Sequence, residues 1–330
     1  MNNPIIDRIS RKIGVPDILE LLSERLSGSE LNSLLQEVFS RKANNISPAL
    51  LLNLYKENRF VQPAETDMIG LLRAEIETLQ FLRDRGFNPI ELSPVAQLGS
   101  CAVVSTTDQK KIISATRNTE VLADATNSLA LYIAHAKREG KFPEGDKDGE
   151  RHVGKEGAGR DGHWRLCTAQ RHVRTPKVTV KGHTAHFKIG CMVSSGMDTG
   201  SYQFECKGLE DHILALHGLL KEVFGVEKIR CKLQKRDGYD ERNPLIDRVY
   251  GYLTGRALPL GIIKEEPASP NNYYKGIQFK MVVAINGQEI EIADGGFVDW
   301  TQQLLGNGKE RLLISGLGLE LLYRFQNKLL

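Results

Sequence analysis

The segment from Trp164 to Cys191, WRLCTAQRHVRTPKVTVKGHTAHFKIGC, decides how the rest of the chain is interpreted. Apolar and polar side chains alternate in its first and last parts, which predicts two antiparallel strands. Between them, Thr175 to Gly182 has the proline, glycine and lysines of a hairpin loop. Arg174 ends the first strand, His183 opens the second, and Phe187 follows four residues later.

This hairpin has the groups that a nucleotide site needs. Cations at its two shoulders would contact phosphate, and an aromatic ring below them would stack on a base. The alternative is that these charges are solvated, as charges at hairpin tips usually are. The hairpin alone does not decide between the two interpretations.

Composition limits the classes of protein that remain. The chain has 330 residues, with 44 basic against 41 acidic side chains, and its net charge of +3 is too small to indicate nucleic acid. It lacks an apolar run long enough to span a membrane and a secretory signal, so we expect a soluble cytoplasmic protein. Five cysteines without a C-x-x-C pair indicate neither a disulfide framework nor a zinc site.

The chain divides near Pro63. Residues 1–63 contain three short apolar stripes at helical spacing, which predict a small helical region that is either a structural appendage or a surface for tRNA or another partner. A capped amphipathic helix begins after Asp67 and ends at Gly86. Beyond it, helices alternate with strands and hairpins, so residues 64–330 are predicted to form one α+β domain with a mostly antiparallel sheet. Strands are expected at 87–95, 101–106 and 111–116, and helices at 126–137 and 209–224.

Residues 140–162 are glycine-rich, charged and almost without apolar side chains, so they are predicted to form a mobile loop, either a lid or solvated filler. Their glycines match neither a P-loop nor a dinucleotide-binding fingerprint. Farther along, Asn286-Gly287 separates two alternating runs and predicts a second hairpin. Its return strand places Glu289 and Glu291 on one face, where carboxylates would bind Mg²⁺ if that face lined a cleft and would otherwise be solvated.

Taken in order, three motifs resemble those of class II aminoacyl-tRNA synthetase catalytic domains. They are Gly86-Phe87-x-x-Ile90-x-x-x-Pro94-Val95, then Arg174 with His183-x-x-x-Phe187, then Gly316-x-Gly318-x-Glu320. The resemblance spans roughly Thr66 to the C-terminus. Within the superfamily the chain looks most similar to the pyrrolysyl, phosphoseryl and phenylalanyl group, through Phe204-Glu205-x-Lys207-Gly208-Leu209 and the strand that carries Glu291.

The resemblance implies an ATP site and homodimerisation through the first motif. Arg174 would contact the α-phosphate and the reacting carboxylate, His183 the γ-phosphate side, and Phe187 the adenine. Glu291 would lie near Mg²⁺, and the turn at Gly316 and Gly318 would form the floor under the adenine. The resemblance also implies an amino-acid pocket formed by Asp124, Thr126, Asn127, Cys191 and Val193, in which Asp124 would pair with an ammonium group.

Two departures from the family pattern bear on activity. Pro176 stands where the second motif has an acidic residue, and Leu321 stands where the third has an arginine that reaches the nucleotide. Loss of that guanidinium would weaken nucleotide binding or transition-state stabilisation. Arg324 lies three residues farther along the same predicted helix, and no anticodon-binding domain is recognisable.

Two hypotheses of function follow. The first is an enzyme that uses ATP to activate an amino acid or related carboxylate as an adenylate and transfers it to tRNA or another acceptor. The second is a degenerate synthetase fold that binds a ligand or partner without turnover. A third idea, nucleic-acid binding, rests on a basic run whose members are usually solvated: Lys228, Arg230, Lys232, Lys235 and Arg236.

Overall fold

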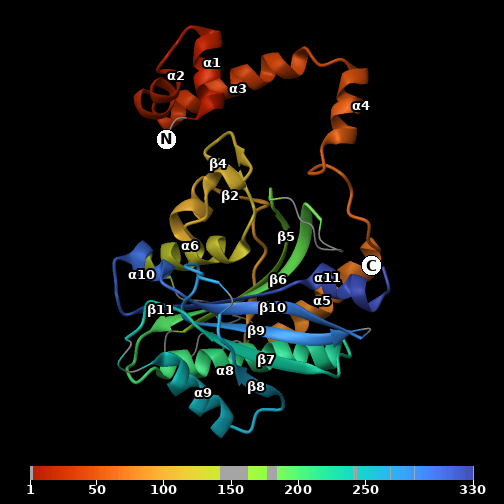
Figure 1. Ribbon diagram of the computed structural model, residues 1–330, viewed down its shortest axis with the longest axis vertical. Coiled ribbons are helices and arrows are strands. Elements are labelled where there is room, and N and C mark those ends of the chain that lie inside the picture. Colours follow the sequence, from red (N-terminus) through yellow and green to blue (C-terminus); the bar gives the residue numbers. More distant parts are fainter. Residues whose placement is uncertain are drawn as a thin grey trace.

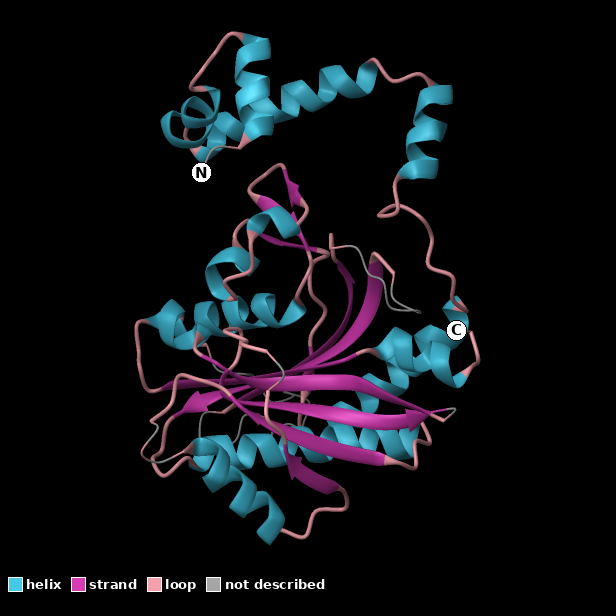
Figure 2. Cartoon of the chain, in the orientation of Figure 1, coloured by secondary structure: helices cyan, strands magenta, loops and turns pink. Residues whose placement is uncertain are grey.

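The centre of the molecule is an eight-stranded sheet with strand order β1-β5-β6-β11-β10-β9-β7-β8 (Figures 1 and 2). The computed structural model describes residues 3–141, 163–176, 184–240, 242, 244–267, 269–285 and 287–329. Strand β1 pairs with β5 and β7 with β8 in parallel, whereas the central pairs are antiparallel. The predicted α+β fold with a mostly antiparallel sheet is therefore confirmed. The strands are β1 (Asn88–Pro89), β5 (Trp164–Val173), β6 (His186–Met197), β7 (Ile229–Lys235), β8 (Gly261–Lys264), β9 (Lys275–Ile285), β10 (Gln288–Val298) and β11 (Glu310–Leu317).

Helices cover the sheet on both faces. The main core cluster joins one face to residues of α5 (Met68–Asp84), α8 (Gln203–Gly218), α9 (Leu245–Gly255) and α11 (Leu319–Gln326). On the other face, α6 (Ala125–Arg138) and α10 (Trp300–Leu305) cover part of β5, β6 and β11. Successive side chains of a strand point to opposite faces of the sheet. Leu313 of β11 thus belongs to the main core cluster, and Leu312 belongs to the cluster beneath α6. The part of the second face that α6 leaves open lies over β9, β10 and the ends of β6 and β11.

Both predicted hairpins are present in the sheet. In the first, β5 and β6 pair so that His172 lies opposite Phe187. In the second, β9 and β10 pair from Ile285 and Gln288 onward, with a bulge between Glu291 and Ala293. The tip of the first hairpin, 177–183, lies outside the described residues, and so does most of the predicted loop at 140–162. The helices expected at 126–137 and 209–224 are also present, the latter as α8 followed by a π-helical turn, Leu219–Val223.

The region before α6 differs from the expected strands. Ser100–Val104 is a π-helical turn rather than the strand expected at 101–106, and Gln109–Lys111 is a 3-10 turn. Glu120 explains this because its carboxylate accepts hydrogen bonds from the backbone N–H groups of Gly99 (2.9 Å) and Cys101 (3.0 Å). A buried carboxylate with backbone donors outweighs the β propensity of a short apolar run. What remains extended is short: β2 (Val95–Gln97), β3 (Ser114–Ala115) and β4 (Thr119–Val121), which form a separate three-stranded sheet.

The N-terminal helices lie apart from the sheet (Figure 1). Ser27 caps the helix Gly28–Asn44 through a capping box with Glu30. Among the described residues of these helices only Ser10 is buried, so they do not form a compact bundle within this chain. They are α1 (Pro4–Ile13), α2 (Ile18–Glu20) with a π-helical turn (Leu21–Arg25), α3 (Gly28–Asn44) and α4 (Pro48–Glu57). The domain boundary near Pro63 stays a prediction.

The segment after α4 contacts the first hairpin next to its tip, at Thr175 and His186. Arg59 donates to the carbonyl of Thr175, and the carbonyl of Gln62 lies 2.7 Å from His186 Nε2. His186 in turn contacts Arg171 at 3.0 Å. The chain entering α5 therefore supports the hairpin on the side away from α6. No helix among the described residues is long and apolar enough to span a membrane.

Gly295 in β10 is the tightest point of the sheet. A Cβ atom there would lie 2.4 Å from the carbonyl oxygen of Ile314 and 2.5 Å from the ring of Phe279. Gly295→Ala should therefore lower the free energy of unfolding by roughly 3 kcal/mol, measured by urea denaturation. Gly261→Ala is the control, because nothing lies within 4 Å of its Cβ position. Equal stability of the two variants would contradict this packing.

Candidate functional site

A cavity of about 590 Å³ opens on the face of the sheet that carries α6. Its wall on one side is the start of α6 and the residues around Lys111. The floor consists of β6, β9, β10 and β11, and the end of β5 contributes Arg174. The cavity therefore unites segments that are far apart in the sequence.

Arg174 follows β5 and lines the cavity. Its backbone N–H donates to the carbonyl of Ala185 at 2.9 Å, which keeps the two hairpin arms paired at this point. The guanidinium carbon lies 5.6 Å from the centroid of the Phe187 ring. No carboxylate of the described residues forms an ion pair with Arg174, so its charge is available to a ligand.

Phe187 supports Arg174 instead of forming the cavity wall. It lies across the hairpin from His172, with ring centroids 6.4 Å apart, and it does not belong to the cavity lining. His183 lies outside the described residues. Of the three groups predicted on this hairpin, the described structure thus brings only Arg174 into the cavity.

His172 lines the cavity behind Arg174 and is neutral. Burial lowers its pKa to about 4 despite the opposing charge of Asp124. Its Nε2 accepts the backbone N–H of Ala125 at 3.1 Å, so the proton of the neutral ring is on Nδ1. The ring therefore holds the first turn of α6 against the hairpin.

Asp124, Thr126 and Cys191 line the cavity as the sequence predicts. Asp124 Oδ1 caps α6 by accepting from the backbone N–H (3.0 Å) and hydroxyl (2.7 Å) of Thr126. The other oxygen, Oδ2, accepts from the Tyr273 hydroxyl at 2.6 Å. The carboxylate is therefore held rigidly at the cavity wall.

Asn127 and Val193 lie outside the cavity lining. Asn127 points into the fold, where its amide nitrogen lies 3.4 Å from Cys101 Sγ and 3.3 Å from Ser105 Oγ. Val193 is on the same face of β6 as Cys191, but helix α6 covers it and it joins the core beside Leu129. The sequence pattern gave the correct strand face but not how far along the strand the helix reaches.

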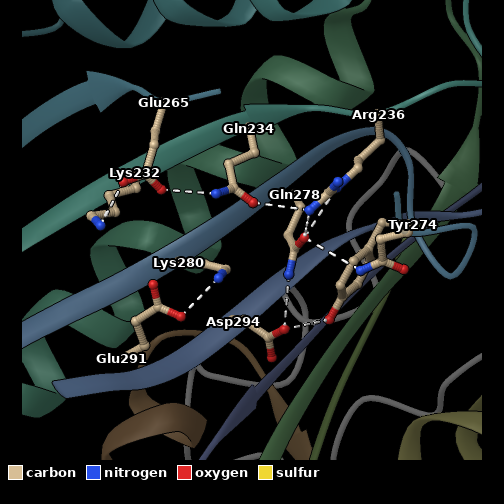
Figure 3. Close-up of polar contacts among 10 residues, drawn as sticks. Lys232, Gln234, Arg236, Glu265, Tyr274, Gln278, Lys280, Glu291 and Asp294 are labelled. Carbon is tan, nitrogen blue, oxygen red and sulfur yellow. Dashed lines mark hydrogen bonds and ion pairs between the residues drawn. The ribbon is translucent and has the colours of Figure 1, made fainter. Parts of the chain in front are cut away.

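Glu291 lines the cavity and pairs with Lys280 of the neighbouring strand at 2.7 Å (Figure 3). Glu289, predicted on the same face, pairs with Arg230 near the outer end of the hairpin and does not line the cavity. The described residues contain no group of three or more His, Cys, Asp or Glu side chains placed to hold a metal ion. Glu291 is thus one of three carboxylates that line the cavity, with Asp124 and Asp294, and it does not belong to a preformed metal centre.

Gly316 and Gly318 line the floor of the cavity. Gly316 is in register with Cys191 on one side and Asp294 on the other, so it occupies the middle of the floor. A Cβ atom at either glycine would meet its nearest neighbour only at 3.5 Å. Packing within the chain therefore does not demand glycine here, and the bare backbone leaves room in the cavity.

The residues after this turn face the core. Leu321, where the family has an arginine, packs against the main core cluster. Glu320 is buried, and its Oε2 accepts from Arg171 (3.0 Å) and from the backbone N–H of Lys188 (3.0 Å). Arg324 is 7% exposed. Neither Leu321 nor Arg324 belongs to the cavity lining. Arg324 therefore does not replace, within the cavity, the arginine that the family has at the position of Leu321.

Sequence reasoning missed Gln278, Lys280 and Asp294, which line the floor. A signal was available for the first two, because polar side chains at 278 and 280 alternate with buried apolar ones at 277, 279 and 281. Asp294 had no such signal. Strict alternation puts it on the face opposite Glu291, and the bulge after Glu291 turns it back toward the cavity.

Similarity to known proteins was found only through the fold. No family model matches the sequence, and no curated protein matches it. A histidine–tRNA ligase subunit from Alicyclobacillus acidocaldarius superposes with a TM-score of 0.59 at 13% identity, over 83% of this chain and 97% of that one. Histidyl-tRNA synthetase from S. aureus gives 0.54 at 12% identity, over 82% and 70% of the two chains.

This chain has the fold of a class II aminoacyl-tRNA synthetase catalytic domain. A protein from Bacillus halodurans described as an ATP phosphoribosyltransferase regulatory subunit/histidyl-tRNA synthetase has the same fold, with a TM-score of 0.53 at 13% identity over 82% of this chain and 83% of that one. At such identities the similarity establishes the fold alone. The more specific resemblance to the pyrrolysyl, phosphoseryl and phenylalanyl group stays a prediction.

Asp294 should make stability depend on pH. Burial raises its pKa, against the smaller opposing effects of hydrogen bonds from Tyr274 and Gln278. A carboxyl group with a higher pKa in the folded state binds more protons when folded, so the free energy of unfolding falls as pH rises from about 4 through the folded-state pKa. Asp294→Asn removes this dependence, and the variant should gain stability relative to wild type between pH 4.5 and pH 8, measured by urea unfolding.

The matched control is Asp247→Asn, whose carboxylate is exposed and pairs with Lys264. It should follow the wild-type pH profile closely. Parallel profiles for wild type and Asp294→Asn would show that Asp294 carries no extra proton in the folded state.

Proposed function

We propose that the protein binds ATP and a small carboxylate, in the simplest case an amino acid, in this cavity and joins them as an acyl adenylate. The observation that supports this most is that one cavity contains both Arg174 and the carboxylates Asp124 and Asp294. A cation without an ion-pair partner suits a phosphate or carboxylate, and held carboxylates suit an ammonium group. Together they are complementary to a zwitterion beside a nucleotide.

Arg174 would act on the reacting groups. Adenylate formation concentrates negative charge around the α-phosphorus as the carboxylate oxygen attacks and pyrophosphate leaves. A guanidinium positioned beforehand stabilises that charge more than it stabilises the separate reactants. Contact of the guanidinium with the Phe187 ring restricts the directions in which it can point.

Asp124 would pair with the ammonium group of the amino acid. Its capping bonds to Thr126 and its bond from Tyr273 orient the carboxylate before any ligand arrives. A preoriented partner lowers the entropic cost of binding. Cys191 and Gly316 would form the floor beneath the ligand.

Mg²⁺ would arrive bound to the nucleotide, since Mg²⁺ in such sites is usually held by one or two carboxylates together with substrate phosphates. Glu291 is the single carboxylate that fits this role, and it would have to exchange its contact with Lys280 for the metal. Transfer of the acyl group to tRNA or another acceptor is proposed as the step after activation.

A second candidate function is ligand binding without turnover. It is favoured by Leu321, which packs into the core where the family has a nucleotide-contacting arginine, and by the ion pair that occupies Glu291. The Bacillus halodurans protein with the same fold is described as a regulatory subunit as well as a synthetase. Fold alone therefore does not imply turnover.

Arg174→Ala should lower amino-acid-dependent exchange of pyrophosphate into ATP by about 10²–10³-fold, the usual effect of removing one transition-state donor. Arg174→Lys should recover only part of the loss, because a lysine cannot make a bidentate contact. The matched control is Arg41→Ala on α3, where the arginine is exposed and pairs only with Glu37.

Calorimetry with ATP and amino acids separates the two candidate functions. Binding together with exchange supports the adenylating enzyme. Binding without exchange supports the second function. A folded protein that binds neither ATP nor any amino acid contradicts both.

We also propose a homodimer formed through α5. Its outward face is apolar, with Met68 69%, Ile69 58% and Ile76 55% exposed. Exposed apolar side chains gathered along one helix face are typical of a protein interface. Ile76→Glu should therefore convert a dimer to a monomer in light scattering at micromolar protein, whereas Glu77→Gln on the same helix should not. A wild-type protein that is already monomeric would contradict the proposal.

A further inference from the structure

The proposed function assigns the ammonium group to Asp124 and gives Asp294, the other aspartate in the cavity, no contact of its own. Asp294 Oδ2 accepts two hydrogen bonds, from the Tyr274 hydroxyl at 3.2 Å and from Gln278 Nε2 at 3.1 Å. No described residue donates to Oδ1. Oδ1 remains accessible to solvent within the cavity that Asp294 lines. One oxygen is thus held by the protein, and the other is left for a ligand.

A chain of hydrogen bonds across β7, β9 and β10 holds this carboxylate in place (Figure 3). Arg236 donates to Gln278 Oε1 through Nε (3.1 Å) and Nη2 (2.6 Å), and also to Gln234 Oε1 at 2.9 Å. Gln234 donates to Glu265 at 2.8 Å, and Glu265 pairs with Lys232 at 2.6 Å. This chain of hydrogen bonds therefore connects the edge of the sheet to the cavity floor.

Within this chain of hydrogen bonds, the partners determine which groups donate and which accept. A guanidinium can only donate, so Gln278 must turn its carbonyl oxygen toward Arg236 and its NH₂ group toward Asp294. Asp294 Oδ2 then meets two donors and can act only as an acceptor. Oδ1 is the one position left on this carboxylate for a ligand, and it calls for an N–H or O–H donor.

Neighbouring cations do not fill that position. Lys280 lies on the adjacent strand but pairs with Glu291 at 2.7 Å. Arg174 contributes charge at longer range and forms no hydrogen bond to Asp294. A buried carboxylate without a direct cationic partner is costly, and a ligand that supplies such a partner would regain that free energy on binding.

The cavity also contains Asp124, which the α-ammonium group of an amino acid would already neutralise. A ligand with one ammonium group can pair closely with only one of two separate carboxylates. Two carboxylates on different elements, the start of α6 and strand β10, therefore suit a ligand with two separate nitrogen donors.

We propose that Asp294 determines specificity and that the substrate is a basic amino acid or a close analogue. Its distal cationic N–H group donates to Asp294 Oδ1, while its α-ammonium group pairs with Asp124. The inference rests on the proposed function, because it assigns the side chain of the amino acid bound in the same cavity. Gln278 and Arg236 are positioning residues, since they orient Asp294 without touching the ligand.

The first test compares matched pairs of ligands with the full-length wild-type protein. Calorimetry with Mg²⁺ and a non-hydrolysable ATP analogue would measure L-arginine against L-citrulline and L-lysine against L-norleucine. Each pair is similar in shape and differs in the charge of the distal group. At least one basic ligand should bind more tightly than its neutral counterpart by about tenfold or more, as expected for a charge-assisted hydrogen bond at a desolvated site.

The second test uses Asp294→Asn, which preserves the shape of the side chain and removes its charge. In this variant the basic and the neutral ligand of a pair should bind with about equal affinity. The affinity of the neutral ligand should differ from its wild-type value by no more than about threefold. Glu289→Gln is the matched control, because Glu289 is a carboxylate on the same strand that pairs with Arg230 outside the cavity. It should keep the wild-type preference.

The outcomes separate the inference from the function on which it rests. Equal binding of basic and neutral ligands by the wild type, or an undiminished preference in a folded Asp294→Asn variant, overturns the role of Asp294 and leaves the proposed function standing. Failure of both ATP and every amino acid to bind to the folded protein overturns both. If the variant does not fold, the wild-type ligand pairs still decide the question.

Discussion

The two-residue repeat of side chains along the central strands is the constraint on which the rest of this structure depends. On β9, Ile277, Phe279 and Met281 enter the main core, so Gln278 and Lys280 must face the opposite side. The same rule on β11 sends Leu313 and Ile314 to different clusters. One face of the sheet is therefore fully committed to stability. The other is covered by α6 only in part, and the polar side chains of β9 and β10 line its uncovered area.

The alternation also explains which features could be predicted from sequence. Hairpins with clear period-two patterns and helices with caps, such as the one at Asp67, carry their own local signals, so their positions were predicted correctly. Features set by distant contacts carried no such signal. Glu120 bends Ser100–Val104 into a helical turn, and the reach of α6 hides Val193. Asp294 reaches the cavity only because a bulge interrupts the pattern, and no spacing rule contains a bulge.

Charge pairing explains why the basic run on β7 does not act as a simple cationic surface. Arg230 pairs with Glu289 and Lys232 with Glu265, whereas Arg236 is only 9% exposed and bonded to Gln278. These cations lie close together in the sequence, but their partners come from other segments of the chain. Three of the five cations are thus engaged within the fold, and nucleic-acid binding through the basic run stays a prediction. The role of these three cations in the fold is to neutralise and orient carboxylates.

The polar network beneath the cavity shows how a buried charge can be tolerated in the sheet. An isolated carboxylate at the position of Asp294 would be unfavourable, and burial raises its pKa accordingly. Hydrogen bonds from Tyr274 and Gln278 offset part of this cost, and Arg236 holds the donor of one of them in the required direction. The remaining cost falls on the unliganded protein, where protonation of Asp294 at low pH also relieves it. Under the role proposed for Asp294, a cationic ligand would relieve the same cost near neutral pH, so this carboxylate would favour cationic ligands more strongly than an exposed one.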